Sequence, residues 1–304
     1  MGGYLDGKAI AVTGAGRGIG RAVALACAAE GARVVVADIG VSLSGEDPTS
    51  EVADAVVAEI TDAGVEAVAV ADTVTTMEGG ERIVATAADR WGSIDGVVCV
   101  AGILRERMLF NMTEDDFDPV VETHLKGTFT VFRAAAARMR QQRGGTLIGF
   151  TSGAFQGSVA QANYSAAKGG VVSLVRSAAA GMRKYGVTAN AVAPVARTRM
   201  SANVPMDLAE MGEPEDVAPL VVYLLSDKAR HVTGQVYTAV GGKIAVWNQP
   251  REVRAMFTQG RWTPEEIEAR LDTVVGQERM PLFDLLDQFD AKREQAADVQ
   301  TAGK

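Results

Sequence analysis

The stretch TGAGRGIG at residues 13–20 decides the fold of this chain. It follows the apolar run AIAV at 9–12, and after it Ile19, Val23 and Cys27 recur at the spacing of one helix face. A strand, a glycine-rich turn and a helix in this order are typical of dinucleotide-binding units. Glycine lets the backbone approach a pyrophosphate closely, and the helix N-terminus offers free N–H groups. The turn therefore predicts a phosphate-binding site at the carboxyl end of the first strand.

The alternation of strand and helix continues to about residue 248. Short runs that are apolar on both faces predict buried strands at 9–12, 33–37, 67–71, 96–100, 146–150, 188–192 and 235–240. Longer segments with helical periodicity separate these strands. The pattern predicts an α/β fold, with a doubly wound parallel sheet of about seven strands and helices on both faces.

Outside this pattern, two segments have a different character. Residues 249–304 are charged and contain no strand-like run, so we expect a sheet domain at 1–248 and a helical C-terminal extension at 249–304. Within the extension, TPEE at 263–266 predicts a helix start, with Thr as the N-cap and Glu three residues later. We expect the extension to pack on the domain or on a partner subunit and to end in a loose tail. The polar segment IGVSLSGEDPTS at 39–50 predicts a surface loop.

The composition excludes several classes of protein. The 304 residues carry a formal net charge of −8, which argues against nucleic-acid and anionic-membrane partners. Cys27 and Cys99 lie in apolar runs, which predicts reduced core thiols and neither a disulfide framework nor a metal site. The N-terminus has no signal-peptide pattern, and no apolar run is long enough to span a bilayer. We expect a cytoplasmic protein.

Two acidic residues follow predicted strands beside the glycine-rich turn. Asp38 comes after the strand at 33–37, where a carboxylate accepts hydrogen bonds from an adenosine ribose and repels a 2′-phosphate. It predicts NAD as the cofactor, although Arg17 favours a 2′-phosphate and Asp38 has the alternative of being a solvated strand-end carboxylate. Asp72, after the strand at 67–71, either hydrogen-bonds an adenine amine or begins a turn.

Three further residues carry acid–base chemistry. Tyr164 and Lys168 are four residues apart, which places both side chains on one face of a helix. A phenol has a pKa of about 10, and a neighbouring ammonium draws that pKa toward neutrality. Ser152 follows the strand at 146–150, where its hydroxyl can hold a substrate carbonyl. The alternatives are a surface Tyr–Lys pair and a turn-capping serine, but behind a dinucleotide turn we expect proton transfer.

Together these motifs resemble the short-chain dehydrogenase/reductase family from about residue 7 to residue 248. The matching positions are Gly14, Gly18 and Gly20 of the turn, Asp38, Asp72, the Ser152/Tyr164/Lys168 triad, and Pro194 with Thr198. Within the family, the chain is most similar to the (3R)-hydroxyacyl-CoA dehydrogenase part of peroxisomal multifunctional enzymes. The segments that carry this likeness are AGILRERMLF at 101–110, THLKGTF at 123–129, SVAQANYSAAKGG at 158–170, and APVARTRM at 193–200 followed by EDVAPLVVYLL at 215–225.

The resemblance implies a Rossmann-type fold and an oxidoreductase that transfers hydride between NAD and a secondary alcohol or ketone. It implies a large apolar small-molecule substrate such as a 3-hydroxyacyl-CoA or a hydroxysteroid. Two alternatives are an NADPH-dependent 3-oxoacyl ketoreductase and a non-catalytic dinucleotide-binding scaffold. The implied cofactor-binding residues are Gly14, Arg17, Gly18, Ile19, Gly20, Asp38, Asp72, Thr73, Ala101, Gly102, Tyr164, Lys168, Pro194 and Thr198. Pro194 would shape the loop beside the nicotinamide, and Thr198 would contact its carboxamide.

The chain departs from the family pattern at four places. The usual Asn-Asn-Ala-Gly is CVAG at 99–102, and the usual Pro-Gly is Pro194-Val195. The frequent active-site Asn is replaced by His124, which either supports a water relay to Lys168 or is a structural histidine. The Ser–Tyr separation is one residue shorter than the commoner one, which leaves Thr151 as a minor rival to Ser152.

Substrate and subunit contacts are predicted more coarsely. An apolar pocket is expected from Met108, Leu109, Phe110, Phe155, Val159 and the stretch 200–211, unless most of these residues are ordinary core. Arg105, Arg107, Arg197 and Arg199 either meet a CoA phosphate or are solvated at the surface. The resemblance implies a homodimer or homotetramer that associates through helices at 103–142, with Leu125, Phe129 and Phe132, and at 163–183.

Overall fold

A single eight-stranded sheet forms the centre of the computed structural model, which describes residues 3–42, 45–46, 48–201, 211–284, 286–288 and 291. The strands are β1 (Ala9–Thr13), β2 (Arg33–Ala37), β3 (Ala67–Val70), β4 (Gly96–Cys99), β5 (Gly145–Phe150), β6 (Val187–Pro194), β7 (Val236–Val240) and β8 (Lys243–Val246). Their order is β3-β2-β1-β4-β5-β6-β7-β8, and the first seven are parallel. The chain therefore reverses direction across the sheet between β1 and β4, where open α/β sheets bind ligands.

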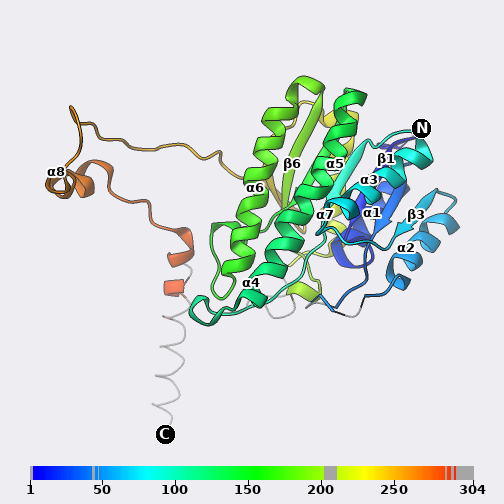
Figure 1. Cartoon of the computed structure of the whole chain (residues 1–304), viewed down its shortest axis with the longest axis horizontal. Coiled ribbons are helices and arrows are strands. Elements are labelled where there is room, and N and C mark those ends of the chain that lie inside the picture. Colours follow the sequence, from blue (N-terminus) through cyan, green and yellow to red (C-terminus); the bar gives the residue numbers. More distant parts are fainter. Residues whose placement is uncertain are drawn as a thin grey trace, which may run out of the picture. The chain divides into compact units, whose positions relative to one another are not determined.

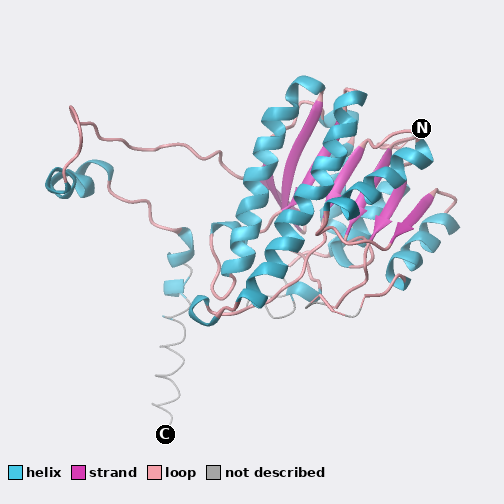
Figure 2. Cartoon of the chain, in the orientation of Figure 1, coloured by secondary structure: helices cyan, strands magenta, loops and turns pink. Residues whose placement is uncertain are grey.

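Seven helices cover the two faces of this sheet (Figures 1 and 2). They are α1 (Gly18–Ala29), α2 (Glu51–Asp62), α3 (Met77–Trp91), α4 (Glu114–Val121), α5 (Gly127–Gln142), α6 (Ala162–Met182) and α7 (Pro214–Leu225). Alternate residues along a strand belong to two hydrophobic cores, one on each face of the sheet. Val34 and Val36 pack with α1, α2 and α7, whereas Val35 and Ala37 pack with α3, α5 and α6. The predicted doubly wound α/β fold is confirmed.

The sheet holds the seven parallel strands and one further strand at its edge. β8 pairs antiparallel with β7 and extends the sheet at its edge. The two strands are joined by Gly241 and Gly242, and Gly241 has a φ of +48°. Two glycines between short apolar runs are a hairpin signal, so the local sequence contains the information for this strand.

The predicted helix at 103–142 is wrong in its extent. A short 3-10 helix occupies Leu109–Asn111, and helix α4 begins only at Glu114, where the side chains of Thr113 and Asp116 form a reciprocal capping box. A π-helical turn, Glu122–Lys126, separates α4 from α5. Phe132 is buried in the core under α5 and is not available for the subunit contact predicted for it, whereas Phe129 is exposed.

The chain divides into two compact units, Met1–Trp247 and Asn248–Lys304. In the second unit, helix α8 (Pro264–Arg270) begins at the predicted TPEE motif, with Thr263 and Glu266 forming the capping box. A π-helical turn, Leu271–Val275, follows it. The described residues from Asn248 to Thr263 contain neither helix nor strand, and residues 281–284 are helical. Among the described residues, none of the helices is long and apolar enough to cross a membrane.

Candidate active site

The glycine-rich turn places free backbone amides at the start of α1. Gly14 has a φ of +66°, and a Cβ on it would lie 2.7 Å from the Ala101 backbone. A Cβ on Gly20 would lie 2.0 Å from the Gly14 carbonyl oxygen. Arg17 is the N-cap residue, and no cap hydrogen bond from its side chain is found among the described residues. The first-turn N–H groups are thus open to an anion, as a pyrophosphate requires.

A cavity of about 470 Å³ opens beside this turn at the carboxyl ends of the strands. It brings together most of the predicted cofactor-binding residues: Gly14, Arg17, Gly18, Ile19, Gly20, Asp38, Asp72, Thr73, Ala101, Gly102 and Thr198. Tyr164 and Lys168 on α6 and Pro194 at the end of β6, which were also predicted to bind the cofactor, are not among the described residues that line it. This cavity suits a dinucleotide. It combines the glycine-rich turn Gly14–Gly20 (the glycine cradle), the uncapped start of α1 and the carboxylate of Asp38.

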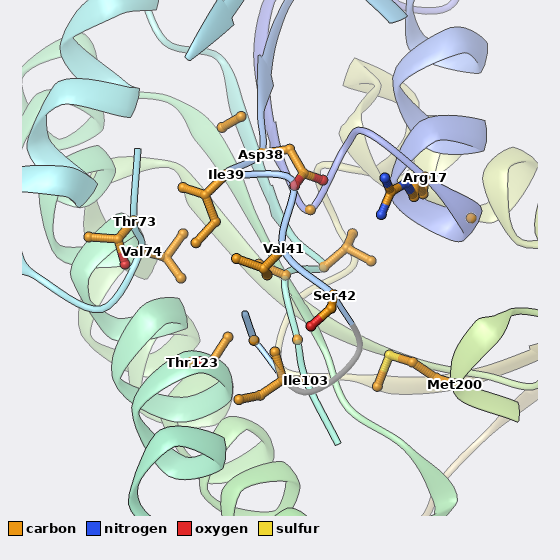
Figure 3. A pocket seen from close by; sticks show the side chains of 18 of the residues that line it. Arg17, Asp38, Ile39, Val41, Ser42, Thr73, Val74, Ile103, Thr123 and Met200 are labelled. Carbon is orange, nitrogen blue, oxygen red and sulfur yellow. The ribbon is translucent and has the colours of Figure 1, made fainter. Parts of the chain in front are cut away.

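Asp38 braces the two turns that frame the cavity. Its Oδ2 accepts a hydrogen bond from the Gly16 N–H at 2.8 Å, and its Oδ1 accepts one from the Gly40 N–H at 2.7 Å. Arg17 lies at the same end of the cavity, as Figure 3 shows. Each carboxylate oxygen keeps a second lone pair, so Asp38 remains able to accept a hydrogen bond from a ligand.

The segment 39–50 is not the plain surface loop that its polarity predicts. Ile39, Val41, Ser42 and Gly45 line the cavity, and the first three are labelled along its wall in Figure 3. The Thr49 N–H donates to the Ile39 carbonyl at 2.9 Å and closes the base of the loop. The loop also reaches Ile103 beyond β4, because a Cβ on Gly45 would lie 3.4 Å from the Ile103 Cδ1 atom. The apolar residues directly after Asp38 therefore form part of the wall of the ligand site.

Asp72 lines the cavity but is engaged with its own neighbours. It forms an ion pair with Arg82 and accepts a hydrogen bond from the Thr73 N–H at 2.8 Å. The hydrogen bond from Arg82 is the main cause that holds the pKa of Asp72 below its usual range. Asp72 was predicted either to hydrogen-bond an adenine amine or to begin a turn, and the structure shows the turn.

Ser152, Tyr164 and Lys168 come together where β5 ends and α6 begins. The hydroxyls of Ser152 and Tyr164 are hydrogen-bonded. The Lys168 ammonium lies 5.5 Å from the centroid of the Tyr164 ring and donates to the Phe150 carbonyl at 2.6 Å. The hydroxyl of Thr151, the predicted rival of Ser152, donates instead to the Lys168 carbonyl at 2.9 Å.

Burial dominates the protonation of this group. It raises the pKa of Tyr164, and the hydrogen bond from Ser152 offsets only part of the rise. It also lowers the pKa of Lys168 to about 7. The sequence predicted that Lys168 would draw the pKa of Tyr164 down. In the structure the pKa of Tyr164 is raised instead, because desolvation outweighs the Ser152 hydrogen bond that lowers it. Desolvation also leaves the Lys168 amine only partly charged near neutrality.

His124 completes the group from the π-helical turn. Its ring packs edge-on against Tyr164, with centroids 5.0 Å apart, and its Nε2 lies 2.8 Å from the Ile103 carbonyl oxygen. A Cβ on Gly102 would lie 2.1 Å from the His124 Cε1 atom. Because Gly102 also lines the cavity, His124 and its neighbours lie directly behind the wall of the ligand site.

The residues predicted to line a substrate pocket do not gather in one place. Leu109 and Phe110 are 73% and 78% exposed, and Met108 and Val159 are also exposed. Phe155 packs against Trp247 with ring centroids 4.8 Å apart. Within the stretch 200–211, Met200 lines the cavity and Met211 is buried, whereas 202–210 lie outside the described residues.

The four arginines predicted to meet a CoA phosphate are divided between two surroundings. Arg107 and Arg197 form ion pairs with Asp116 and Glu213, respectively. Arg105 and Arg199 line the cavity, and Arg105 also donates to the Asp115 carbonyl at 2.6 Å.

Several residues that line the cavity were not predicted from the sequence as ligand-binding residues. They are Ile39, Val41, Val74, Thr75, Ile103, Pro119, Glu122 and Thr123. Val74 follows the end of β3 by four residues, and Ile103 follows the end of β4 by four residues. Their position just after a strand end is the sequence feature that could have placed them at the cavity. Pro119, Glu122 and Thr123 come from α4 and the π-helical turn, which only the tertiary fold brings to the cavity.

Known proteins are similar to this chain over most of its length. A family model described as enoyl-(acyl carrier protein) reductase matches residues 14–243. The crystal structure of a short chain dehydrogenase from Mycobacterium avium superposes with a TM-score of 0.82 at 47% sequence identity. The superposition covers 91% of this chain and 97% of the chain of that crystal structure.

Two known enzymes are similar to this chain over most of its length. A hydroxyacyl-CoA dehydrogenase of Mycobacterium tuberculosis is 38% identical over 301 residues, which are 93% of this chain and 93% of that protein. Peroxisomal multifunctional enzyme type 2 of Mus musculus is 43% identical over 266 residues, which are 86% of this chain but 36% of that enzyme. The first relative therefore matches along almost its whole length, and the second over about a third.

Proposed function

Because the chain belongs to the short-chain dehydrogenase/reductase family, as its motifs predicted, we propose that it is an NAD-dependent dehydrogenase of 3-hydroxyacyl-CoA substrates. The family makes it an oxidoreductase that acts on a hydroxyl group with a nicotinamide dinucleotide. The observation that carries the proposal is the Ser152–Tyr164–Lys168 group, with Lys168 buried and the two hydroxyl residues half-buried, beside the wall of the glycine-lined cavity.

The chain's own residues suit the proton transfer of alcohol oxidation. The Ser152 and Tyr164 hydroxyls, already hydrogen-bonded to each other, would both contact the substrate oxygen. Tyr164 would accept the substrate proton in its phenolate form, which burial disfavours and which the charged form of Lys168 would stabilise. Burial makes this electrostatic support stronger than it would be in water. When bound, the nicotinamide dinucleotide supplies the hydride acceptor.

NAD is proposed over NADP because of Asp38. Its carboxylate is fixed by the Gly16 and Gly40 amides at the end of β2, where a 2′-phosphate would meet negative charge. Arg17 at the same end of the cavity favours the runner-up function, an NADPH-dependent 3-oxoacyl ketoreductase. The two functions differ in which cofactor binds more tightly.

The substrate class is proposed from the relatives. The M. tuberculosis relative that aligns along 93% of both chains is named a hydroxyacyl-CoA dehydrogenase. Arg105 and Arg199 on the cavity supply cations for the phosphates of CoA. A hydroxysteroid is the alternative large apolar alcohol. The division into a dehydrogenase domain at 1–248 and an extension at 249–304, association into dimers or tetramers, and a cytoplasmic location stay predictions.

A substrate panel tests the proposal. The purified chain is mixed with NAD or NADP and with (3R)-hydroxyacyl-CoA, (3S)-hydroxyacyl-CoA or a hydroxysteroid, and formation of the reduced nicotinamide is followed. We expect turnover with NAD and a hydroxyacyl-CoA. Turnover restricted to NADP would favour the ketoreductase, and tight nucleotide binding without turnover of any alcohol or ketone would favour the non-catalytic scaffold.

A further inference from the structure

The turn that follows Ser152 sets the direction of its hydroxyl. Ser152 is the N-cap of the 3-10 helix Gly153–Gln156 (the serine turn), and its Oγ accepts a hydrogen bond from the Ala154 N–H at 3.3 Å. The Ser152 carbonyl accepts one from the Phe155 N–H at 3.0 Å. The Ser152 hydroxyl is also hydrogen-bonded to Tyr164, and this bond lowers the pKa of the phenol, as a donor to the phenolate does. The geometry of the serine turn therefore decides whether Ser152 donates toward Tyr164.

The serine turn is weakly held by its own backbone. Gly153 and Gln156 are exposed, and no described atom lies within 4 Å of a Cβ on Gly153. A 3-10 helix has hydrogen bonds of poorer geometry than an α-helix, and this one ends at Gly157, which has a φ of +115°. Phe155 is the large apolar side chain of the turn, and it packs against the core that α3, α5 and α6 share with the sheet. Phe155 therefore anchors the turn.

Trp247 is the aromatic partner of Phe155. The two rings meet edge to face, with centroids 4.8 Å apart and planes at 71°, an arrangement that aromatic pairs favour. Trp247 is itself fixed to strand β7 at two points. Its backbone N–H donates to the Val236 carbonyl at 2.9 Å, and its indole Nε1–H donates to the Thr238 hydroxyl at 2.9 Å. Trp247 is therefore a rigid support for the Phe155 ring.

The position of Trp247 sets it apart from its neighbours on the edge hairpin. Ile244 and Val246 of β8 are 59% and 60% exposed, whereas Trp247, directly after β8, is half-buried against the same core as Phe155. Trp247 is also the last residue of the first compact unit. Its contact with Phe155 thus lies within that unit and links the edge of the sheet to the turn beside Ser152.

We propose that Trp247 is a positioning residue, which packs against Phe155, holds the serine turn in place and so keeps the Ser152 hydroxyl directed at Tyr164 and the substrate oxygen. This inference rests on the proposed function for its role in catalysis. The ring contact and the hydrogen bonds of the turn concern only residues of this chain.

Loss of this support should change the acid–base behaviour of Tyr164. The titratable groups near the phenol are Lys168 on its own helix, His124 on the π-helical turn, and Cys99 on β4 beyond Lys168. A substitution at Trp247 leaves all three side chains in the chain. Since the bond from Ser152 lowers the pKa of Tyr164, a misdirected Ser152 leaves that pKa higher. Alcohol oxidation needs the phenolate, so the acid limb of kcat/KM should move to higher pH.

Hydrogen exchange of the serine turn tests the contact without turnover. Mass spectrometry follows a peptide that spans residues 152–157, which contains the hydrogen-bonded N–H groups of Ala154, Phe155 and Gly157. We expect Trp247→Leu to speed exchange in this peptide by about tenfold, because local opening becomes easier. Trp247→Phe keeps a ring against Phe155 and should speed it by less than about threefold. Trp91→Leu is the matched control, because Trp91 at the end of α3 packs half-buried on the same core, and it should leave exchange unchanged.

The kinetic test asks whether Trp247 acts through Ser152. With a hydroxyacyl-CoA and NAD, Trp247→Leu should lose about tenfold in kcat with KM within about twofold, and its acid limb should rise by about half a pH unit. In a chain that already carries Ser152→Ala, the same substitution should cost less than about twofold in kcat, because the residue through which it acts is gone. Phe155→Leu breaks the contact from the other side and replaces Trp247→Leu if that variant does not fold, as judged by its unfolding transition.

Unchanged exchange in Trp247→Leu would overturn the inference, and so would a loss of kcat that is equally large in the Ser152→Ala chain. If the unsubstituted chain oxidises no hydroxyacyl-CoA although Trp247→Leu loosens the turn, the proposed function fails and the contact stands. Turnover by the unsubstituted chain together with unchanged exchange in Trp247→Leu would leave the function intact and refute the role of Trp247.

Discussion

The ring of His124 meets the ring of Tyr164 edge to face, with centroids 5.0 Å apart and planes at 85°. The two residues are 40 positions apart in the chain, one on the π-helical turn and the other on α6. The phenol ring also lies near the Lys168 ammonium, 5.5 Å from the ring centroid. The contact with His124 ties the acid–base group to Gly102, and through it to the wall of the cavity.

Asp38 should set the choice of cofactor. The substitution Asp38→Asn keeps an oxygen that can accept from the Gly16 or Gly40 N–H but removes the negative charge. We expect the preference for NAD over NADP to fall by about tenfold or more, because the repulsion of a 2′-phosphate is lost. Fluorescence titration with both nucleotides measures the ratio. Asp54→Asn, at an exposed position on α2, is the charge-matched control, and equal ratios in the two variants would refute the role of Asp38.

The glycine cradle should tolerate no side chain. A Cβ in Gly20→Ala would lie 2.0 Å from the Gly14 carbonyl oxygen, so the turn must open. We expect NAD affinity to drop by about a hundredfold and stability to fall by about 1–3 kcal/mol. Calorimetric titration and chemical unfolding give the two values. Gly181→Ala, where no described atom lies within 4 Å of the added Cβ, should leave NAD affinity unchanged and raise stability by up to about 1 kcal/mol.

Lys168 should make the fold less stable at low pH. Its folded pKa of about 7 lies below the unfolded value of 10.5. Between these values the unfolded chain binds more protons than the folded one, so stability rises with pH across this window. Below about pH 7 the folded state carries the full cost of a buried charge.

Lys168→Met removes that cost. We expect the variant to be more stable than the unsubstituted chain by about 2–5 kcal/mol near pH 6, with the difference shrinking toward pH 10. Urea unfolding at several pH values is the measurement. A difference that does not change with pH would mean that the amine is not desolvated as the structure indicates.

Local sequence pattern predicted the fold because each βα unit is encoded in consecutive residues. The apolar runs at β1 to β7, the turn after β1 and the capping box at Thr263 all depend on short-range chemistry. β8 has a local signal as well, the pair Gly241-Gly242 between two short apolar runs, which is typical of a hairpin. Cys27 and Cys99 are free and buried as their apolar surroundings predicted.

Features that depend on tertiary packing could not be predicted in the same way. The π-helical turn at Glu122–Lys126 has no distinct residue pattern, and the exposure of Leu109 and Phe110 contradicts their hydrophobicity. The direction of the Tyr164 pKa depends on how deeply the fold buries the phenol, which a four-residue spacing does not report. Ile39 and Val41 likewise line the cavity only because of the way the loop after β2 folds, which the local sequence does not show.

The most direct test of the account is the rate of NAD reduction by a hydroxyacyl-CoA in Tyr164→Phe. This variant removes one hydroxyl from a ring held by His124 and Lys168, so the fold and NAD affinity should persist. We expect kcat to fall by about 10²–10⁴-fold, as for loss of a general base, whereas Tyr223→Phe on α7 should retain full activity. Turnover of Tyr164→Phe at the rate of the unsubstituted chain would contradict the account.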